Sequence, residues 1–121
     1  MIIDDNLAFA DMITEYLSEL EVTIYKIIDF EDEKDIIKKI EEIMPNLILL
    51  DINLGKASGL NVIENIKRNI NLAKIPIIII TASDYNDVIR SLIRGENNII
   101  GFCSKLEIDD IKDRVIKLFK E

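Results

Sequence analysis

Residues 75–81 read Ile-Pro-Ile-Ile-Ile-Ile-Thr, and this stretch decides the fold. Its apolar residues do not alternate with polar ones, which is typical of a strand that is buried on both faces of a parallel sheet. Residues 47–51, Leu-Ile-Leu-Leu-Asp, form a second run of this kind. Each run ends in one polar residue. The sequence therefore predicts a covered parallel sheet with polar side chains at the ends of its strands.

Segments with apolar residues at three- and four-residue steps, typical of amphipathic helices, alternate with the strand-like runs. We predict strands at residues 1–3, 22–27, 47–50, 75–80 and 99–103, and helices within residues 9–20, 36–44, 60–70, 88–93 and 108–119. Parallel neighbours need a crossover, which a helix supplies in the right-handed sense. Five such units are too few for an eight-stranded barrel. The expected α/β fold is an open, doubly wound parallel sheet of five strands with five helices.

The composition bounds the domain organisation and the partners. The 121 residues, 49% of them hydrophobic, fit one domain over residues 1–121. The net charge of -8 disfavours binding to nucleic acid or to anionic lipid, because both require basic side chains. The apolar run over residues 75–80 falls well short of the roughly 20 residues of a membrane helix. We expect no nucleic acid and no membrane as partners of this domain.

The sequence contains no histidine and one cysteine, Cys103. The missing histidine excludes His-based metal sites, His-activated nucleophiles and phosphohistidine carriers. Cys103 lies in an apolar run, so we predict that it is a small buried core residue. A lone cysteine forms no internal disulfide, so we expect a reducing, cytoplasmic location. Any phosphoryl chemistry here must use another residue type.

Polar side chains follow four of the five predicted strands. They are Asp4 and Asp5, then Asp51, then Thr81 with Ala82 and Ser83 after it, and finally Lys105. In doubly wound folds, ligands bind at this edge of the sheet. Carboxylates bind Mg²⁺, while a hydroxyl and an ammonium can bind phosphoryl oxygens. The pattern predicts a site for a divalent cation and a phosphoryl group, with Asp51 as the nucleophile and the Asp4–Asp5 pair as metal ligands.

Each of these residues has a simpler interpretation when it is taken alone. An acidic pair such as Asp4–Asp5 can cap the helix that follows it. Asp51 can be a loop residue, Thr81 a strand-ending hydroxyl and Lys105 a surface lysine. Their joint placement at the ends of four strands is what favours a functional site.

Four segments then carry a resemblance to a known family. They are IIDDN (residues 2–6), LILLDINLGKASGL (47–60), IPIIIITAS (75–83) and GFCSK (101–105). With Gly59 eight residues after Asp51 and Thr81 thirty after it, the chain resembles a response regulator receiver domain of two-component signalling, of the chemotaxis-regulator type. The likeness covers essentially the whole chain. It implies a flavodoxin-like, three-layer sandwich with strand order 2-1-3-4-5.

The resemblance also implies a phosphorylation site. Asp51 would be the phosphoacceptor, and Lys105 would pair with the phosphoryl oxygens. Asp5 and Asp51 would ligate Mg²⁺ directly, Asp4 largely through water, and Asn53 through its backbone carbonyl. Such a domain catalyses its own phosphorylation and dephosphorylation without turning over a small-molecule substrate.

The same resemblance implies a switch. Thr81 would move toward the phosphoryl group, and Phe102 would follow inward as an aromatic switch residue. Ala82 would leave room at the phosphorus, while Asn53 and Ser83 would flank the path of water and tune the lifetime of the phosphoryl group. The face that responds would comprise residues 88–93, 99–103 and 108–119, where receivers dimerise or dock partners.

A histidine kinase or a histidine phosphotransfer protein would donate the phosphoryl group, and a homodimer is a further expectation. The alternative function is a degenerate receiver that docks proteins without phosphorylation. A haloacid-dehalogenase-type phosphatase is a poor fit, because Asn53 stands where its second aspartate is needed. A flavodoxin-type electron carrier is also a poor fit, because Asp4 and Asp5 stand where a hydroxyl-rich loop is needed.

Three departures from the family pattern bear on the site. Leu106 follows Lys105 where the family usually has proline, so we expect no cis peptide bond there. Gly55 replaces a common proline, which should loosen the loop beside the metal site. Only three residues precede Asp4, so we expect the natural start to lie further upstream.

Overall fold

The computed structural model describes residues 1–81 and 98–120. In chain order the elements are β1 (Ile2–Ile3), α1 (Leu7–Tyr16), the 3₁₀ turn η1 (Ser18–Leu20), β2 (Lys26–Ile27), α2 (Glu33–Ile43), β3 (Ile48–Asp51), α3 (Gly59–Arg68), β4 (Ile77–Thr81), β5 (Ile99–Ser104) and α5 (Ile108–Lys120). Strands and helices alternate as the periodicity predicts. The helix predicted over residues 88–93 lies outside the described residues, which contain four α-helices.

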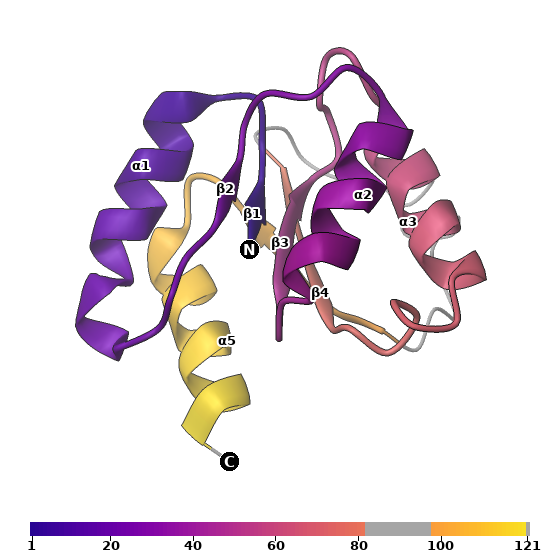
Figure 1. The fold of residues 1–121 in the computed structure, drawn as a ribbon. Coiled ribbons are helices and arrows are strands. Elements are labelled where there is room, and N and C mark those ends of the chain that lie inside the picture. The colour runs from indigo at the N-terminus through magenta and orange to yellow at the C-terminus, as the bar shows by residue number, and fades with distance from the viewer. Residues whose placement is uncertain (82–97, 121) are drawn as a thin grey trace.

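The five strands form one parallel sheet in the order β2-β1-β3-β4-β5, which confirms the predicted order. Helices α1 and α5 lie on one side of this sheet, and α2 and α3 lie on the other (Figure 1). The chain therefore forms three layers. The carboxyl ends of β1, β3, β4 and β5 share one edge, so residues that follow these strands are neighbours in space.

Each face of the sheet has its own buried cluster. Ile48 and Leu50 of β3 belong to a cluster with side chains of α2 and α3. Leu49, between them, belongs to a second cluster with side chains of α1 and α5. All residues of β3 and β4 are buried, which explains why both sequences are apolar without alternation. None of the described helices combines the length and apolar character that a membrane crossing requires.

Cys103 of β5 is buried with the α1 and α5 side chains, as the sequence predicts. Burial, helped by the nearby Asp110 carboxylate, raises the pKa of its thiol to about 12. A thiol with so high a pKa stays protonated at neutral pH and is a poor nucleophile. Cys103 is therefore a core residue in this fold.

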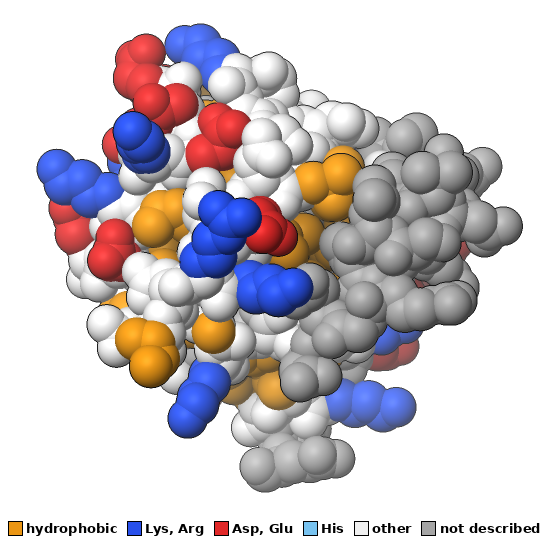
Figure 2. Space-filling view, turned by 90° about the vertical axis from the view of Figure 1, so that its right-hand side faces the viewer, with side chains coloured by type: hydrophobic (Ala, Val, Ile, Leu, Met, Phe, Trp, Pro, Cys, Tyr) orange, Lys and Arg blue, Asp and Glu red, His pale blue; other side chains and the backbone are white. Residues whose placement is uncertain are grey.

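The outer surfaces of α2 and α3 are polar. Acidic and basic side chains lie close together on this side of the molecule, with apolar side chains between them (Figure 2). Lys39 with Asp35, and Arg68 with Glu64, form pairs one helical turn apart. The Arg68–Glu64 pair is exposed and contributes little to stability. Among the described residues on this face, basic side chains lie beside acidic ones.

The second strand is shorter than predicted. The sequence favours a strand over residues 22–27, whereas β2 pairs with β1 only at Ile2↔Lys26 and Ile3↔Ile27. A strand exists only where a neighbour supplies hydrogen bonds, and β1 contributes two residues to this pairing. The carbonyl oxygen of Tyr25 still accepts from the N–H of Ile2 at 2.8 Å, so residues 22–24 are the part of the predicted strand that extends beyond this pairing.

Gly59 fixes where α3 begins against the end of β3. Its N–H donates to the carbonyl oxygen of Ile52 at 3.0 Å, and Ser58 caps the helix by accepting from the N–H of Asn61. A Cβ at Gly59 would lie 2.6 Å from the Cα of Ile52 and 2.8 Å from the carbonyl oxygen of Asp51. Both neighbours are backbone atoms at the end of a buried strand, so they cannot move aside cheaply.

We predict that Gly59→Ala lowers the free energy of unfolding by about 2 kcal/mol or more, because the methyl group would displace backbone. Urea unfolding followed by circular dichroism measures this change. Gly101→Ala is the matched control, since a Cβ there would meet the end of the flexible Arg114 side chain at 2.5 Å. Equal losses in the two variants would contradict the prediction.

Candidate functional site

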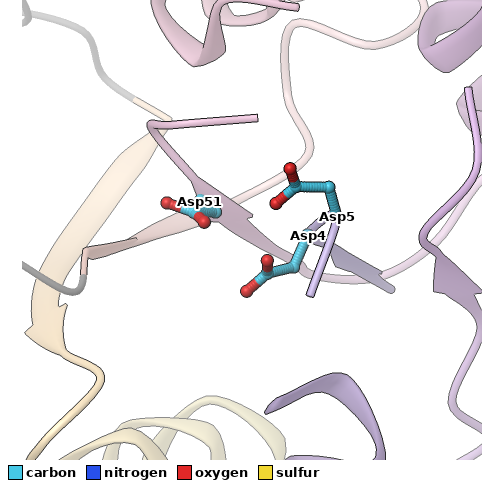
Figure 3. A group of neighbouring side chains, drawn as sticks. All are labelled: Asp4, Asp5 and Asp51. Atoms are coloured by element: carbon cyan, nitrogen blue, oxygen red, sulfur yellow. The ribbon is translucent and has the colours of Figure 1, made fainter. Parts of the chain in front are cut away.

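Three carboxylates meet at the carboxyl edge of the sheet. Asp4 follows β1, Asp51 ends the neighbouring strand β3, and Asp5 follows Asp4. One carboxylate oxygen of each lies within 4.8 Å of the others. Asp4 and Asp51 are buried, with 1% and 4% of their surface exposed, whereas Asp5 is exposed. Figure 3 shows the carboxyl groups of Asp4 and Asp5 on the side of their backbone that looks toward Asp51.

The amine of Lys105 joins this cluster from the end of β5. Its Nζ lies 2.7 Å from Oδ2 of Asp4 and 3.1 Å from Oδ2 of Asp51. The structure thus brings together all four charged residues that the sequence singled out. Three carboxylates and one ammonium leave two negative charges without a partner among these groups. Hard oxygen donors with an excess of negative charge suit a divalent cation such as Mg²⁺.

Backbone N–H groups hold the other oxygens of the two buried carboxylates. Oδ1 of Asp4 accepts from the N–H of Asn6 at 2.9 Å, and Oδ1 of Asp51 accepts from the N–H of Asn53 at 3.0 Å. Each is a local turn in which an aspartate bonds the backbone two residues on. The N-cap of α1 is Asn6, which accepts from the N–H of Phe9 at 3.0 Å. The simple capping interpretation therefore applies to Asn6 and leaves Asp4 and Asp5 for the cluster.

The surroundings of the cluster shift its proton affinities. Burial, together with the charge of Asp4, raises the pKa of Asp51 above its ordinary value, although the Asn53 N–H and Lys105 oppose this shift. Burial alone would lower the pKa of Lys105, but its bonds to Asp4 and Asp51 outweigh this effect and raise the pKa. The lysine therefore stays charged, and the ionised form of Asp51 is disfavoured.

A serine secures the turn where the family pattern has proline. No described peptide bond is cis, as the presence of Leu106 predicts. The N–H of Leu106 donates to Oγ of Ser104 at 3.1 Å, and the N–H of Lys105 donates to the carbonyl oxygen of Thr81 at 2.9 Å. Proline has no N–H and could not make the first bond. The sequence analysis did not predict this role of Ser104. The available signal was a serine two residues before Leu106, which stands where the family usually has proline.

Gly55 lets the loop after β3 approach the cluster. Its φ is 71°, a conformation closed to proline, whose ring fixes φ near -65°. A Cβ at this position would lie 2.9 Å from Oδ2 of Asp5. Glycine therefore allows the backbone of this loop to pass close to the Asp5 carboxylate. The expectation that the loop is looser stays a prediction.

The predicted switch residues Thr81 and Phe102 lie on the neighbouring strands β4 and β5. Thr81 is buried at the end of β4, and strand alternation places its side chain on the same face as Ile77 and Ile79. Phe102 pairs with Ile79 across β4 and β5 and packs against the hydrophobic cluster that contains Ile77 and Ile79. Their predicted roles are untested by this arrangement.

The remaining predicted residues are Asn53, close to Asp51, and two residues outside the described part of the chain. Asn53 is exposed next to Asp51, and its N–H holds Oδ1 of that residue. Ala82 and Ser83 lie outside the described residues. Within residues 1–81 and 98–120, the structure therefore brings together the charged residues of the predicted site, Asp4, Asp5, Asp51 and Lys105.

Comparison with known sequences gives one family. A family model described as the response regulator receiver domain matches residues 1–115. Response regulator Rcp1 of Synechocystis is 50% identical over 48 residues, which are 39% of this chain and 33% of Rcp1. The phosphate regulon transcriptional regulatory protein PhoB of Escherichia coli is 28% identical over 101 residues, which are 83% of this chain and 43% of PhoB. The matches thus span less than half the length of these curated relatives.

Solved structures agree with the sequence comparison. The signal receiver domain attributed to a Luxo repressor protein from Vibrio parahaemolyticus has a TM-score of 0.81 at 28% identity, over 98% of this chain and 87% of that one. The Mn(2+)-bound form of Rcp1 has a TM-score of 0.69 at 25% identity, over 98% and 91%. Both similarities extend over nearly the whole chain.

We predict that Asp51→Asn, measured without divalent cations at pH 7, raises the free energy of unfolding by about 1 kcal/mol. The reason is that folding buries the Asp51 carboxylate in an environment that disfavours its charge. Thermal unfolding in buffers that contain EDTA measures the difference. Lys105 keeps Asp4 as a partner in this variant.

The pH dependence of this difference has a defined sign. The pKa of Asp51 is higher in the folded chain than its ordinary value of 3.8, so the folded state binds the proton more readily. Wild-type stability from this group therefore falls as the pH rises through the window above 3.8, and the advantage of Asp51→Asn grows there and shrinks below it. Asp113→Asn, a change of an exposed aspartate of α5, is the control. A difference independent of pH would contradict the assignment.

Proposed function

The chain belongs to the response regulator receiver domain family of two-component signalling, and from that premise we propose that Asp51 accepts a phosphoryl group from a histidine kinase or a histidine phosphotransfer protein. The observation that carries the proposal is the ammonium of Lys105 between Asp4 and Asp51 in a buried acidic cluster. Residues 1–121 contain no histidine, so a phosphohistidine donor must lie outside this domain.

The chemistry uses the two oxygens of Asp51 differently. The N–H of Asn53 holds Oδ1, while Oδ2 faces Lys105. A carboxylate oxygen attacks phosphorus, the P–N bond of the phosphohistidine breaks, and its electron pair leaves with the imidazole. Lys105 can then exchange its bond to Asp51 for a bond to a phosphoryl oxygen, which limits the charge that builds up there.

The acidic cluster fits a divalent cation, and we propose Mg²⁺. Asp5 and Asp51 would hold it directly, Asp4 through water, and Asn53 through its backbone carbonyl. When bound, such a cation neutralises charge on the transferring phosphoryl group. The excess of carboxylates over ammonium groups supports this assignment, as does the Mn(2+)-bound form of the relative Rcp1.

Phosphorylation would act on the face formed by residues 88–93, β5 and α5. A phosphoryl group adds about -1.5 to -2 charge and three acceptor oxygens beside Thr81 and Lys105. Thr81 would turn toward these oxygens, and Phe102 would follow inward. Ala82, Ser83 and Asn53 would set the access of water and thus the lifetime of the phosphoryl group.

The changed face would dock a partner or form a homodimer. We further propose that residues 1–121 act as one receiver module in the cytoplasm that does not itself bind nucleic acid. The net charge of -8 supports the last point, because a nucleic-acid surface needs basic side chains.

We predict that incubation with Mg²⁺ and acetyl phosphate adds one phosphoryl group that is stable in acid and labile in base. Intact mass spectrometry should detect this adduct on the wild type and on Asp113→Asn, but not on Asp51→Asn. The absence of an adduct on a folded wild-type chain that binds Mg²⁺ would instead favour a degenerate receiver that docks proteins without phosphorylation.

We predict that Mg²⁺ raises the melting temperature by several degrees, because it relieves repulsion among Asp4, Asp5 and Asp51. Binding at 100 times Kd stabilises a folded chain by about 2.7 kcal/mol. Differential scanning fluorimetry measures the shift, which Asp5→Ala should abolish and Asp113→Ala should retain. Asp5 is exposed, so its replacement should leave the fold intact. An unchanged wild-type melting temperature would contradict the metal site.

A further inference from the structure

The ammonium of Lys105 has a third neighbour besides the two carboxylates. Its Nζ lies 4.6 Å from the centroid of the Phe9 ring and over its face. Phe9 is 8% exposed and the Lys105 side chain 12%, so little water separates the two groups. An ammonium over an aromatic face is attracted by the ring quadrupole, and the attraction is stronger when the pair is shielded from water.

The start of α1 ties Phe9 to the acidic cluster. The N–H of Phe9 donates to Oδ1 of Asn6, the N-cap, and the N–H of Asn6 donates to Oδ1 of Asp4. The other oxygen of Asp4 contacts Lys105. These contacts close a circuit from Asp4 through Asn6 and Phe9 to Lys105 and back to Asp4. The ring is therefore placed relative to the same carboxylate that holds the ammonium.

The backbone hydrogen bonds near Lys105 fix only the start of its side chain. Contacts at the ammonium group must orient the rest. The N–H groups of Lys105 and Leu106 are fixed by Thr81 and Ser104, which places the start of the side chain. Leu106 itself is 86% exposed and cannot pack tightly over the lysine stem. Among residues 1–81 and 98–120, the ammonium contacts Asp4, Asp51 and the Phe9 ring.

We propose that Phe9 is a positioning residue that holds the ammonium of Lys105 between Asp4 and Asp51. As it bears on phosphoryl transfer, the proposal rests on the proposed function. A ring face attracts a cation without accepting a proton and with little directional demand. The ammonium can thus move from Asp51 to a phosphoryl oxygen while it keeps the ring beside it. The competing explanation is that Phe9 only fills the core with Ala10 and Ile13 of α1.

Two measurements separate these explanations. The first is the proton chemical shift of the Lys105 side chain beside its nitrogen, which a ring face moves upfield. We expect the upfield shift in the wild type, its loss in Phe9→Leu, and its retention in Phe30→Leu. Phe30 is the control because it is 4% exposed and lies in the other core cluster.

The second measurement is the rate of phosphoryl uptake from acetyl phosphate with Mg²⁺. We expect Phe9→Leu to lower this rate by about fivefold and Phe30→Leu to leave it nearly unchanged. Progressively fluorinated phenylalanines at position 9 keep the shape of the ring and weaken its quadrupole, so the rate should fall in steps along this series. A core-filling role would not produce that gradation.

Three results would overturn the proposal: no upfield shift in the wild type, equal rates in Phe9→Leu and Phe30→Leu, or no effect of fluorination. If the wild type takes up no phosphoryl group, the proposed function fails. The chemical shift then still decides whether Phe9 positions Lys105, so the two failures are distinguishable.

Discussion

The ammonium of Lys105 lies between two carboxylates that the fold has removed from water, and the carboxyl edge of the sheet depends on this contact. Asp4 directly follows β1 and Asp51 ends the neighbouring strand β3, so parallel pairing brings their charges together wherever the sheet forms. Two buried carboxylates without a cation would be strongly destabilising. The amine, 2.7 Å and 3.1 Å away, makes their burial tolerable while leaving a negative excess.

Packed strands and local backbone hydrogen bonds hold Asp4 and Asp51 in the geometry that Lys105 contacts. The buried apolar strand β3 places the backbone of Asp51, and Gly59 lets α3 begin directly against its end. Short turns at Asn6 and Asn53 each occupy one oxygen of a buried carboxylate and orient the other toward Lys105. The site is therefore a consequence of local backbone bonding at the ends of packed strands.

Sequence reasoning reached the fold and the charged residues of the site because both follow from short patterns. Continuous apolar runs predict buried parallel strands, and the residues after such runs must share one edge of the sheet. The length of β2 was not predictable in this way, because it depends on how many residues β1 offers for pairing. Ser104 and Phe9 were missed because their roles arise from contacts that no spacing encodes. Ser104 accepts from the N–H of Leu106, which a proline at that position would lack. Phe9 contacts Lys105, which is far from it in the sequence.

The excess negative charge of the carboxylate cluster affects both the stability of the fold and the proposed phosphoryl chemistry. Burial raises the pKa of Asp51, so a proton competes for the oxygens that we propose attack phosphorus. Lys105 and any cation held by Asp5 and Asp51 favour the ionised carboxylate, because they lower the free energy of its charge. The charge repulsion that weakens the fold would thus also favour the binding of a cation by the cluster. A neutral residue in place of Asp51 would relieve the repulsion and also remove the proposed nucleophile. If Asp51 has that role, stability and phosphoryl chemistry cannot both be maximal at this edge of the sheet.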